Sequence, residues 1–247
     1  MLKSIAARIW ALWGIAIFIS SLLLLFPFFL LLGLRREPLR SRIAYRIFRI
    51  WMRCLLPLLG IRIRTSGENY FEHGRNYVVV CNHRSFMDIP VTTTRIPGPN
   101  KTIAKIEMSR IPFFGTIYRT GSVLVDRKDP RSRSESYQQM KKVLASGLHM
   151  LIYPEGTRNN SDQPLGKFHS GAFNLAVETR IPVIPATLRG TDKILPNRKF
   201  LYLLPGTISF DMLPPVEPGE NAEELKKKII EIMHNRLSSI SNQTQRP

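Results

Sequence analysis

The chain has 247 residues, and its 36 lysines and arginines against 18 aspartates and glutamates give a formal net charge of +18. So basic a balance points to an anionic partner, such as nucleic acid, phospholipid headgroups or an acidic carrier protein. The two cysteines, Cys54 and Cys81, have no zinc-type spacing and no partner framework, so they indicate neither a disulfide scaffold nor a metal site.

The N-terminal segment is strongly apolar. From Ile9 to Leu34 the chain carries no charged residue over 26 positions, whereas roughly 20 are needed to cross the hydrocarbon core of a bilayer. A cleaved signal peptide is disfavoured because its apolar region is typically about 7–15 residues long. We therefore expect the chain to enter a membrane. Because Pro27 removes a backbone donor, a straight crossing and a kinked helix that turns back both remain open.

Basic residues dominate the stretch that follows. They are Arg35, Arg36, Arg40, Arg42, Arg46, Arg49, Arg53, Arg62 and Arg64. Only Lys3 and Arg8 precede the apolar run, so the positive-inside rule predicts that the C-terminal bulk lies in the cytoplasm.

Four of these arginines predict a second, amphipathic helix. Arg42, Arg46, Arg49 and Arg53 recur at intervals of four, three and four, which places them on one helical face. Apolar side chains cover the remainder, namely Ile43, Ile47, Ile50, Trp51, Cys54 and Leu55. We expect this helix to lie at the lipid interface, with its guanidinium groups among lipid phosphates. A solvated basic face is the alternative.

The rest of the chain predicts an α/β fold. Residues 61–247 are enough for one domain with a sizeable core, preceded by a membrane-docking two-helix segment over residues 1–60. Short β-rich runs alternate with helical patterns, which favours a central mixed sheet flanked by helices. The runs are Tyr77–Cys81, Thr102–Ala104, Ser122–Val125, Met150–Tyr153, Val183–Leu188 and Thr207–Phe210.

Two helices of this domain have recognisable ends. One is predicted from Arg133 to Ser146, with Gly147 as its stop. Another opens at Asn221, where Glu224 follows three residues later. The side chains expected to face the core are Tyr137, Met140 and Leu144 in the first helix, and Leu225, Ile229, Ile232 and Leu237 in the second.

A histidine and an aspartate follow the first predicted strand. His83 and Asp88 are five residues apart in the stretch Asn82–Asp88, a spacing that neither a regular helix nor a regular strand would pair. A turn followed by a helix start could bring them together. Neutral His83 could then remove a proton from a hydroxyl while Asp88 holds the ring. The alternative is that Ser85 and Asp88 form a capping box that serves only the helix terminus.

Other strand ends carry polar residues. Arg127 follows the strand after Gly121, and Lys105 follows Thr102–Ala104. Glu155 and Arg158 flank a glycine turn after another strand. Ligands of α/β sheets sit at strand ends, and a planar guanidinium suits a pair of phosphate oxygens. The alternative for each is a solvated loop charge.

Several familiar motifs are missing from the sequence. It contains no phosphate-binding P-loop, dinucleotide fingerprint or paired metal-ligand histidines. Ser170 resembles the nucleophile of a serine hydrolase, but Phe168 stands where the motif requires glycine. We expect no dissociable cofactor and no metal.

Four blocks, in this order, closely resemble the glycerolipid acyltransferases, and most of all the bacterial 1-acyl-sn-glycerol-3-phosphate acyltransferases. They are Asn82–Asp88, which matches the family's His-x4-Asp motif; Gly121–Arg127, its Gly/Arg block; Tyr153–Arg158, its Glu-Gly block; and Ile181–Ala186, its proline-bearing strand. Lys105 also resembles the family's lysine between the first two blocks. One departure is Val123–Val125, where many relatives carry a phenylalanine.

The resemblance implies that the sn-2 hydroxyl of lysophosphatidic acid attacks a fatty acyl thioester of coenzyme A or acyl carrier protein, giving phosphatidic acid. It implies catalytic roles for His83 and Asp88. The residues that it implies for acceptor binding are Lys105, Arg127, Glu155, Gly156, Thr157 and Arg158. Glu155 cannot attract a phosphate, so we expect it to accept from the glycerol hydroxyl or to clamp an arginine.

The expected location is a membrane, specifically the bacterial inner membrane with the catalytic domain on its cytoplasmic side, with no nucleic acid partner. Two alternatives remain. One is an acyltransferase for another lysolipid, such as a lyso-ornithine lipid. The other is a non-enzymatic, membrane-anchored basic protein that binds nucleic acid or acidic lipid and releases no thiol from an acyl thioester.

Overall fold

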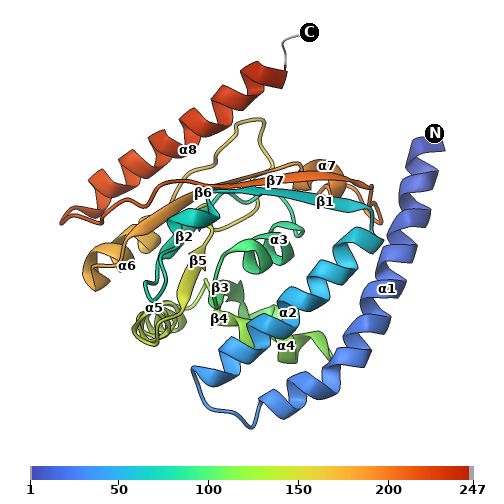
Figure 1. Ribbon diagram of the computed structural model, residues 1–247, viewed down its shortest axis with the longest axis horizontal. Coiled ribbons are helices and arrows are strands. Elements are labelled where there is room, and N and C mark those ends of the chain that lie inside the picture. Colours follow the sequence, from blue (N-terminus) through green and yellow to red (C-terminus); the bar gives the residue numbers. More distant parts are fainter. Residues whose placement is uncertain (1, 245–247) are drawn as a thin grey trace.

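The computed structural model, which describes residues 2–244, is built on a seven-stranded sheet with the order β1-β7-β6-β2-β5-β3-β4 (Figure 1). The strands are β1 (Ile61–Ser66), β2 (Val78–Cys81), β3 (Asn100–Lys105), β4 (Ser122–Val125), β5 (His149–Ile152), β6 (Val183–Arg189) and β7 (Gly206–Met212). All neighbours are parallel except β6 and β7, which are antiparallel. The predicted mixed sheet is confirmed. β1 is a strand that the sequence did not predict.

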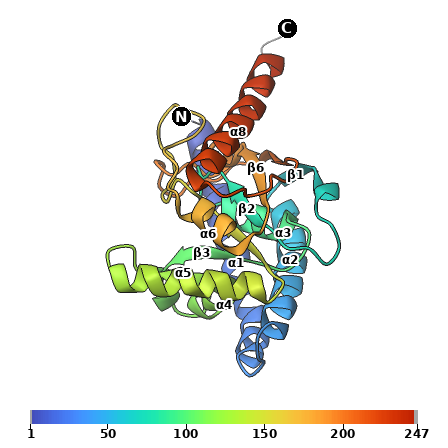
Figure 2. The same cartoon turned by 90° about the vertical axis from the view of Figure 1, so that its left-hand side faces the viewer.

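Helices cover both faces of the sheet (Figures 1 and 2). They are α1 (Leu2–Leu32), α2 (Leu39–Leu58), α3 (Asp88–Arg95), α4 (Phe114–Gly121), α5 (Pro130–Ala145), α6 (Gly171–Thr179), α7 (Thr191–Ile194) and α8 (Ala222–Thr244), with 3-10 turns η1 (Glu68–Tyr70) and η2 (Ile106–Arg110). Side chains alternate along β2, so Val79 and Cys81 pack in the core under α1, α2 and α3. Val78 and Val80 pack in the opposite core, under α5, α6 and α8.

Side-chain caps determine where the two predicted helices begin. Helix α5 starts three residues earlier than predicted, because the Asp129 carboxylate accepts from the backbone N–H groups of its first turn. Asn221 caps α8 as predicted, with its Oδ1 accepting from the N–H of Glu223 at 2.9 Å. Within α8, Met233 is fully buried and Ile232 only partly so.

Helix α1 continues through Pro27 without a break and is long and apolar enough to cross a membrane. It lies along the α/β part over its whole length (Figure 1). Near its start, the Ala7 carbonyl accepts from the Leu203 N–H, and near its end the rings of Phe26 and Phe113 pack edge to face. A crossing that carried the start of α1 to the far side of a bilayer would have to break the first of these contacts.

The outer side of α1 carries a continuous set of exposed apolar side chains. They are Leu2, Ile5, Ile9, Leu12, Trp13, Ile15, Ile19, Leu23, Leu24, Phe28, Leu30 and Leu31. An apolar surface of this extent is typical of contact with lipid or another protein.

The structure corrects the prediction that the apolar side of α2 is buried in lipid. Trp51 and Leu55 pack inside the protein core, and Ile43 and Ile47 pack partly against it. Only Ile50 and Cys54 of the predicted apolar set are exposed. The reason is that α2 fills the space between α1 and the sheet. Of the four arginines on the opposite side, Arg42, Arg46 and Arg53 are exposed, which is compatible both with contact to lipid headgroups and with a solvated basic face.

Glu37 links the turn between α1 and α2 to the start of β3. Its Oε1 lies 2.8 Å from the Nζ of Lys101, which is largely buried. Burial of the Glu37 carboxyl opposes ionisation, but hydrogen bonds from Lys101, Ser41 and Arg40 outweigh it and lower its pKa to about 2, from an ordinary 4.5. This contact therefore stabilises the folded chain above about pH 4.5, and the contribution is lost as the pH falls towards 2.

We expect Glu37→Gln to lower the free energy of unfolding at neutral pH by about 1–3 kcal/mol, because it leaves the Lys101 ammonium buried without a charged partner. Denaturant unfolding in detergent would measure the loss. The difference from the unmodified protein should shrink as the pH falls below 4.5. Glu135→Gln, in the exposed pair with Arg131, is the control and should change stability by less than about 0.5 kcal/mol.

Candidate active site

The end of β2 is held by Asn82. Its side-chain Nδ2 donates to the Leu188 carbonyl at 2.9 Å, and its Oδ1 accepts from the Leu188 N–H at 2.7 Å. Through these two bonds, the Asn82 side chain extends the pairing of β2 with β6 beyond the end of β2. It holds His83, the next residue, at the carboxyl edge of the parallel strands.

His83 and Asp88 are brought together by the turn that the sequence required. Nδ1 of His83 lies 2.7 Å from Oδ2 of Asp88, the first residue of α3, whose side chain is 1% exposed. The same oxygen accepts from the backbone N–H groups of Arg84 and Ser85 at 2.6 and 2.8 Å. The catalytic and capping interpretations therefore describe a single carboxylate, which holds both the turn and the ring.

One face of the His83 imidazole packs on an aromatic ring. The rings of His83 and Tyr153 stack, with centroids 4.3 Å apart and an interplanar angle of 24°. The Tyr153 hydroxyl lies 2.6 Å from Oγ1 of Thr92, and burial raises the pKa of Tyr153 well above its ordinary value. Tyr153 thus stays neutral and limits how the ring can tilt. With Nδ1 on Asp88, Nε2 is the nitrogen left to exchange a proton with a substrate.

Glu155 is held by the backbone of the site. Its carboxylate is buried, and its two oxygens accept from the backbone N–H groups of His83 at 2.7 Å and Gly166 at 2.9 Å. Within residues 2–244 no arginine pairs with it, and it ties the His83 loop to residue 166. Burial raises the pKa of Glu155, and the two N–H groups partly offset that rise. Any other residue at position 166 would place its Cβ 2.5 Å from this carboxylate, which explains why a glycine occupies the position.

The three residues after Glu155 lead the chain across the site. Gly156 has a φ of 69°, a conformation that favours glycine, and Thr157 is exposed. Arg158 turns back towards His83's loop. Its guanidinium lies 3.5 Å above the Phe86 ring, and Nη1 donates to Oδ1 of Asn197 at 2.9 Å. Burial lowers the pKa of Arg158, and the nearby Asp88 carboxylate opposes that change.

Lys105 and Arg127 lie farther along the same edge. β2, β5, β3 and β4 are neighbours in that order and run parallel, so the residues after them form a row. Lys105 ends β3 and is exposed, and Arg127 follows β4 by two residues. Tyr118 lies between them. Burial raises its pKa, and the Lys105 backbone and the Arg127 charge partly offset the rise.

Some residues of the site were not singled out from the sequence. Tyr153 stacks on His83, Thr92 holds Tyr153, and Asn197 receives Arg158. Tyr153 is the first residue of the Glu-Gly block and directly follows β5, so its position at a strand end was a usable signal. Asn197 lies in an irregular loop, where nothing in the local pattern marks it. Within the described residues, no group of three or more His, Cys, Asp or Glu side chains is placed to hold a metal ion.

A buried carboxylate that orients a histidine at the carboxyl edge of an α/β sheet, beside a row of cationic side chains, defines a protein suited to proton transfer on an anionic substrate. The family to which the chain belongs agrees with this. The chain is a member of the acyltransferase family, whose model matches residues 62–189, just over half of the sequence.

Individual relatives carry more specific names. A 1-acyl-sn-glycerol-3-phosphate acyltransferase of Chlamydomonas reinhardtii is 35% identical over 159 residues, which cover 64% of this chain and 47% of the relative. The Escherichia coli enzyme of the same name is 27% identical over 199 residues, which cover 76% of this chain and 78% of the relative. The crystal structure of the 1-acyl-sn-glycerophosphate acyltransferase PlsC from Thermotoga maritima has the same fold, with a TM-score of 0.82 and 24% identity. The match covers 96% of this chain and 97% of that structure. The chain spans about half to two thirds of the first curated relatives it matches.

Proposed function

We propose that the protein transfers a fatty acyl group from a thioester to the sn-2 hydroxyl of 1-acyl-sn-glycerol-3-phosphate, producing phosphatidic acid. The observation that carries the proposal is the 2.7 Å contact between His83 and the buried Asp88 at the carboxyl edge of the sheet. Membership of the acyltransferase family and the names of the relatives support the choice of reaction.

In the proposed reaction, Nε2 of His83 takes the hydroxyl proton as the oxygen attacks the thioester carbonyl. Asp88 accepts from Nδ1 and faces the imidazolium that forms. When the C–S bond breaks, His83 returns the proton to the departing thiolate. No acyl-enzyme is required, because His83 carries the proton from the hydroxyl to the thiolate in this scheme.

The acceptor carries a phosphomonoester with a charge of about −1.5 to −2 near neutral pH. Lys105, Arg127 and Arg158 are the cations that we assign to it. Lys105 and Arg127 follow β3 and β4, and the Arg158 guanidinium lies over Phe86, next to the His83 loop. Gly156 and Thr157 form the turn that presents Arg158. Glu155 supports the site by holding the His83 loop.

The membrane supplies the acceptor in this proposal. We assign the exposed apolar side of α1 to the lipid phase and the arginine-bearing face of α2 to the cytoplasmic headgroup region, with residues 1–60 as the docking segment and residues 61–247 as the catalytic domain. In a bacterial cell this corresponds to the cytoplasmic side of the inner membrane. Docking would bring lysophosphatidic acid to the site without its leaving the bilayer.

The direct test is thiol release by the purified protein in detergent or vesicles, with acyl-coenzyme A and acyl carrier protein donors and a panel of lysolipids. Release that depends on lysophosphatidic acid, with phosphatidic acid as product, is the expected result. Release only with another lysolipid, such as lyso-ornithine lipid, would reassign the acceptor. Anion or lipid binding without any thiol release would favour a non-enzymatic protein.

We expect Arg158→Ala to raise the KM for lysophosphatidic acid about tenfold, because a charge-assisted contact to phosphate is lost. The KM for the acyl donor should change little. Arg198→Ala removes a nearby exposed guanidinium that donates to the Asn160 carbonyl, and this control should leave both constants unchanged. An unaltered KM for lysophosphatidic acid in Arg158→Ala would contradict the assignment.

A further inference from the structure

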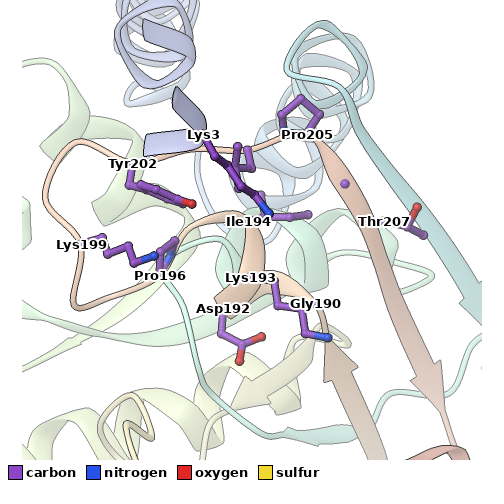
Figure 3. Close-up of a pocket in the computed structure, with 12 residues that line it drawn as sticks. Lys3, Gly190, Asp192, Lys193, Ile194, Pro196, Lys199, Tyr202, Pro205 and Thr207 are labelled. Atoms are coloured by element: carbon purple, nitrogen blue, oxygen red, sulfur yellow. The ribbon is translucent and has the colours of Figure 1, made fainter. Parts of the chain in front are cut away.

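A hollow of about 450 Å³ lies beside the candidate active site, between α7, the start of β7 and the first turn of α1 (Figure 3). Three of its lining residues carry ammonium groups, namely Lys3, Lys193 and Lys199. Asp192 is the only carboxylate among the lining residues, and its Oδ2 lies 3.3 Å from Nε of Arg84. The lining is therefore positively charged overall.

The remaining walls are largely apolar. They are formed by Ile194, Pro196, Tyr202, Leu204 and Pro205, together with Gly190 and Gly206. The Nζ of Lys199 lies 4.5 Å from the centre of the Tyr202 ring, so part of this wall combines an aromatic face with a cation. A hollow of this size falls within the range of small-molecule sites. Its mixture of apolar walls and ammonium groups suits a ligand with a flat apolar part and several negative charges.

The hollow shares structure with the His83 loop. The carbonyl of Leu195, directly after α7, accepts from the Ser85 hydroxyl at 2.7 Å. Asp192, on α7, pairs with Arg84. Because Arg84 and Ser85 also donate their backbone N–H groups to Asp88, one short segment separates the hollow from the catalytic pair.

Sheet topology places the hollow on a particular side of His83. β6 and β7 lie on one side of β2, and the hollow is built at the end of β6 and the start of β7. β5, β3 and β4 lie on the other side, and Lys105 and Arg127 follow β3 and β4 there. Arg158, after β5, instead reaches over Phe86 to Asn197, in the loop that follows α7. The hollow and the pair Lys105 and Arg127 thus lie on opposite sides of the proposed base, and each could supply counter-charges to one of two anionic substrates.

We propose that this hollow binds the phosphorylated nucleotide end of coenzyme A, so that the donor thioester reaches His83 from the β6 and β7 side. The inference rests on the proposed acyl transfer and deepens it by identifying the donor. Coenzyme A carries a diphosphate and a ribose 3′-phosphate, which match the ammonium groups of Lys3, Lys193 and Lys199. Its adenine is a flat ring suited to the apolar walls. An acyl carrier protein would offer a single phosphodiester and no nucleotide to fill the hollow.

The test compares Lys193→Gln/Lys199→Gln with the unmodified protein in steady-state kinetics. We expect the KM for acyl-coenzyme A to rise about tenfold, with kcat and the KM for lysophosphatidic acid unchanged. The KM for the matching acyl-pantetheine, which lacks the phosphates, should not change. Lys227→Gln/Lys228→Gln removes the same charge from the exposed side of α8 and is the control, with no expected effect on either donor.

Three kinetic outcomes would overturn the assignment. They are an unchanged KM for acyl-coenzyme A, an equal rise for acyl-pantetheine, and a rise confined to acyl carrier protein, which would indicate an acidic protein partner instead. Calorimetric binding of coenzyme A and of adenosine 3′,5′-bisphosphate gives a readout independent of turnover. Binding that is weakened about tenfold by the double substitution, in a protein that releases no thiol from any donor, would support the hollow while contradicting acyl transfer.

Discussion

His83→Ala is expected to lower the turnover of acyl-coenzyme A with lysophosphatidic acid by at least 10²–10⁴-fold, the usual range for loss of a general base. The reason is the position of the ring, which is oriented by Asp88 on one nitrogen and stacked on Tyr153. The substitution removes the group that we propose takes the hydroxyl proton. Thiol release by the purified variant in detergent would measure the loss.

Two controls make this result interpretable. His73→Ala changes an exposed histidine outside the site and should keep full activity. Circular dichroism and denaturant unfolding should show that His83→Ala remains folded, because the His83 ring contributes no large part of either hydrophobic core. Turnover by folded His83→Ala close to that of the unmodified protein would refute the role assigned to His83.

Asp88→Asn should reduce turnover by about 10²-fold or more, with little change in the KM for either substrate. The Oδ2 atom of Asp88 accepts three hydrogen bonds, from Nδ1 of His83 and from the N–H groups of Arg84 and Ser85. The amide oxygen can take the place of Oδ2 and keep all three bonds, but it carries no negative charge. The imidazolium that forms in the proposed reaction then faces a neutral acceptor, and the charge that would stabilise it is lost.

A structural role alone would produce a different result. Nitrogen NMR of the labelled His83 ring reports which nitrogen carries the proton, and we expect it to remain Nδ1 in Asp88→Asn, because the amide oxygen still accepts there. Ser85→Ala, which removes the hydroxyl bond to Leu195 and leaves Asp88 in place, provides the comparison and should keep most of the turnover. Full turnover by Asp88→Asn with the tautomer unchanged would show that Asp88 only holds the turn and is not the charged partner of His83.

Local patterns predicted much of the fold. The six strands expected from apolar runs are all present. Short, fully buried strands such as Val78–Cys81 consist of consecutive apolar, mostly β-branched residues, and such runs are typical of strands inside a sheet. β1 was missed because Arg62 and Arg64 alternate with apolar residues at the edge of the sheet. The apolar side of α2 was assigned to lipid for a related reason. A hydrophobic face has the same sequence pattern whether it covers a sheet or a membrane, and only the packing of Trp51 and Leu55 distinguishes the two.

By itself, the sequence predicted the contact between His83 and Asp88, because the two residues lie within one turn and their contact depends on local geometry that five residues can specify. It also determined the row of cations, since residues that follow parallel strands must share an edge. Only the tertiary structure revealed the contacts of Glu155, which accepts from a backbone N–H 72 residues away. Only the tertiary structure revealed the cationic hollow, whose lining brings Lys3 together with Lys193 and Lys199. Contacts between segments so far apart depend on how helices and strands pack, and no local pattern records that packing.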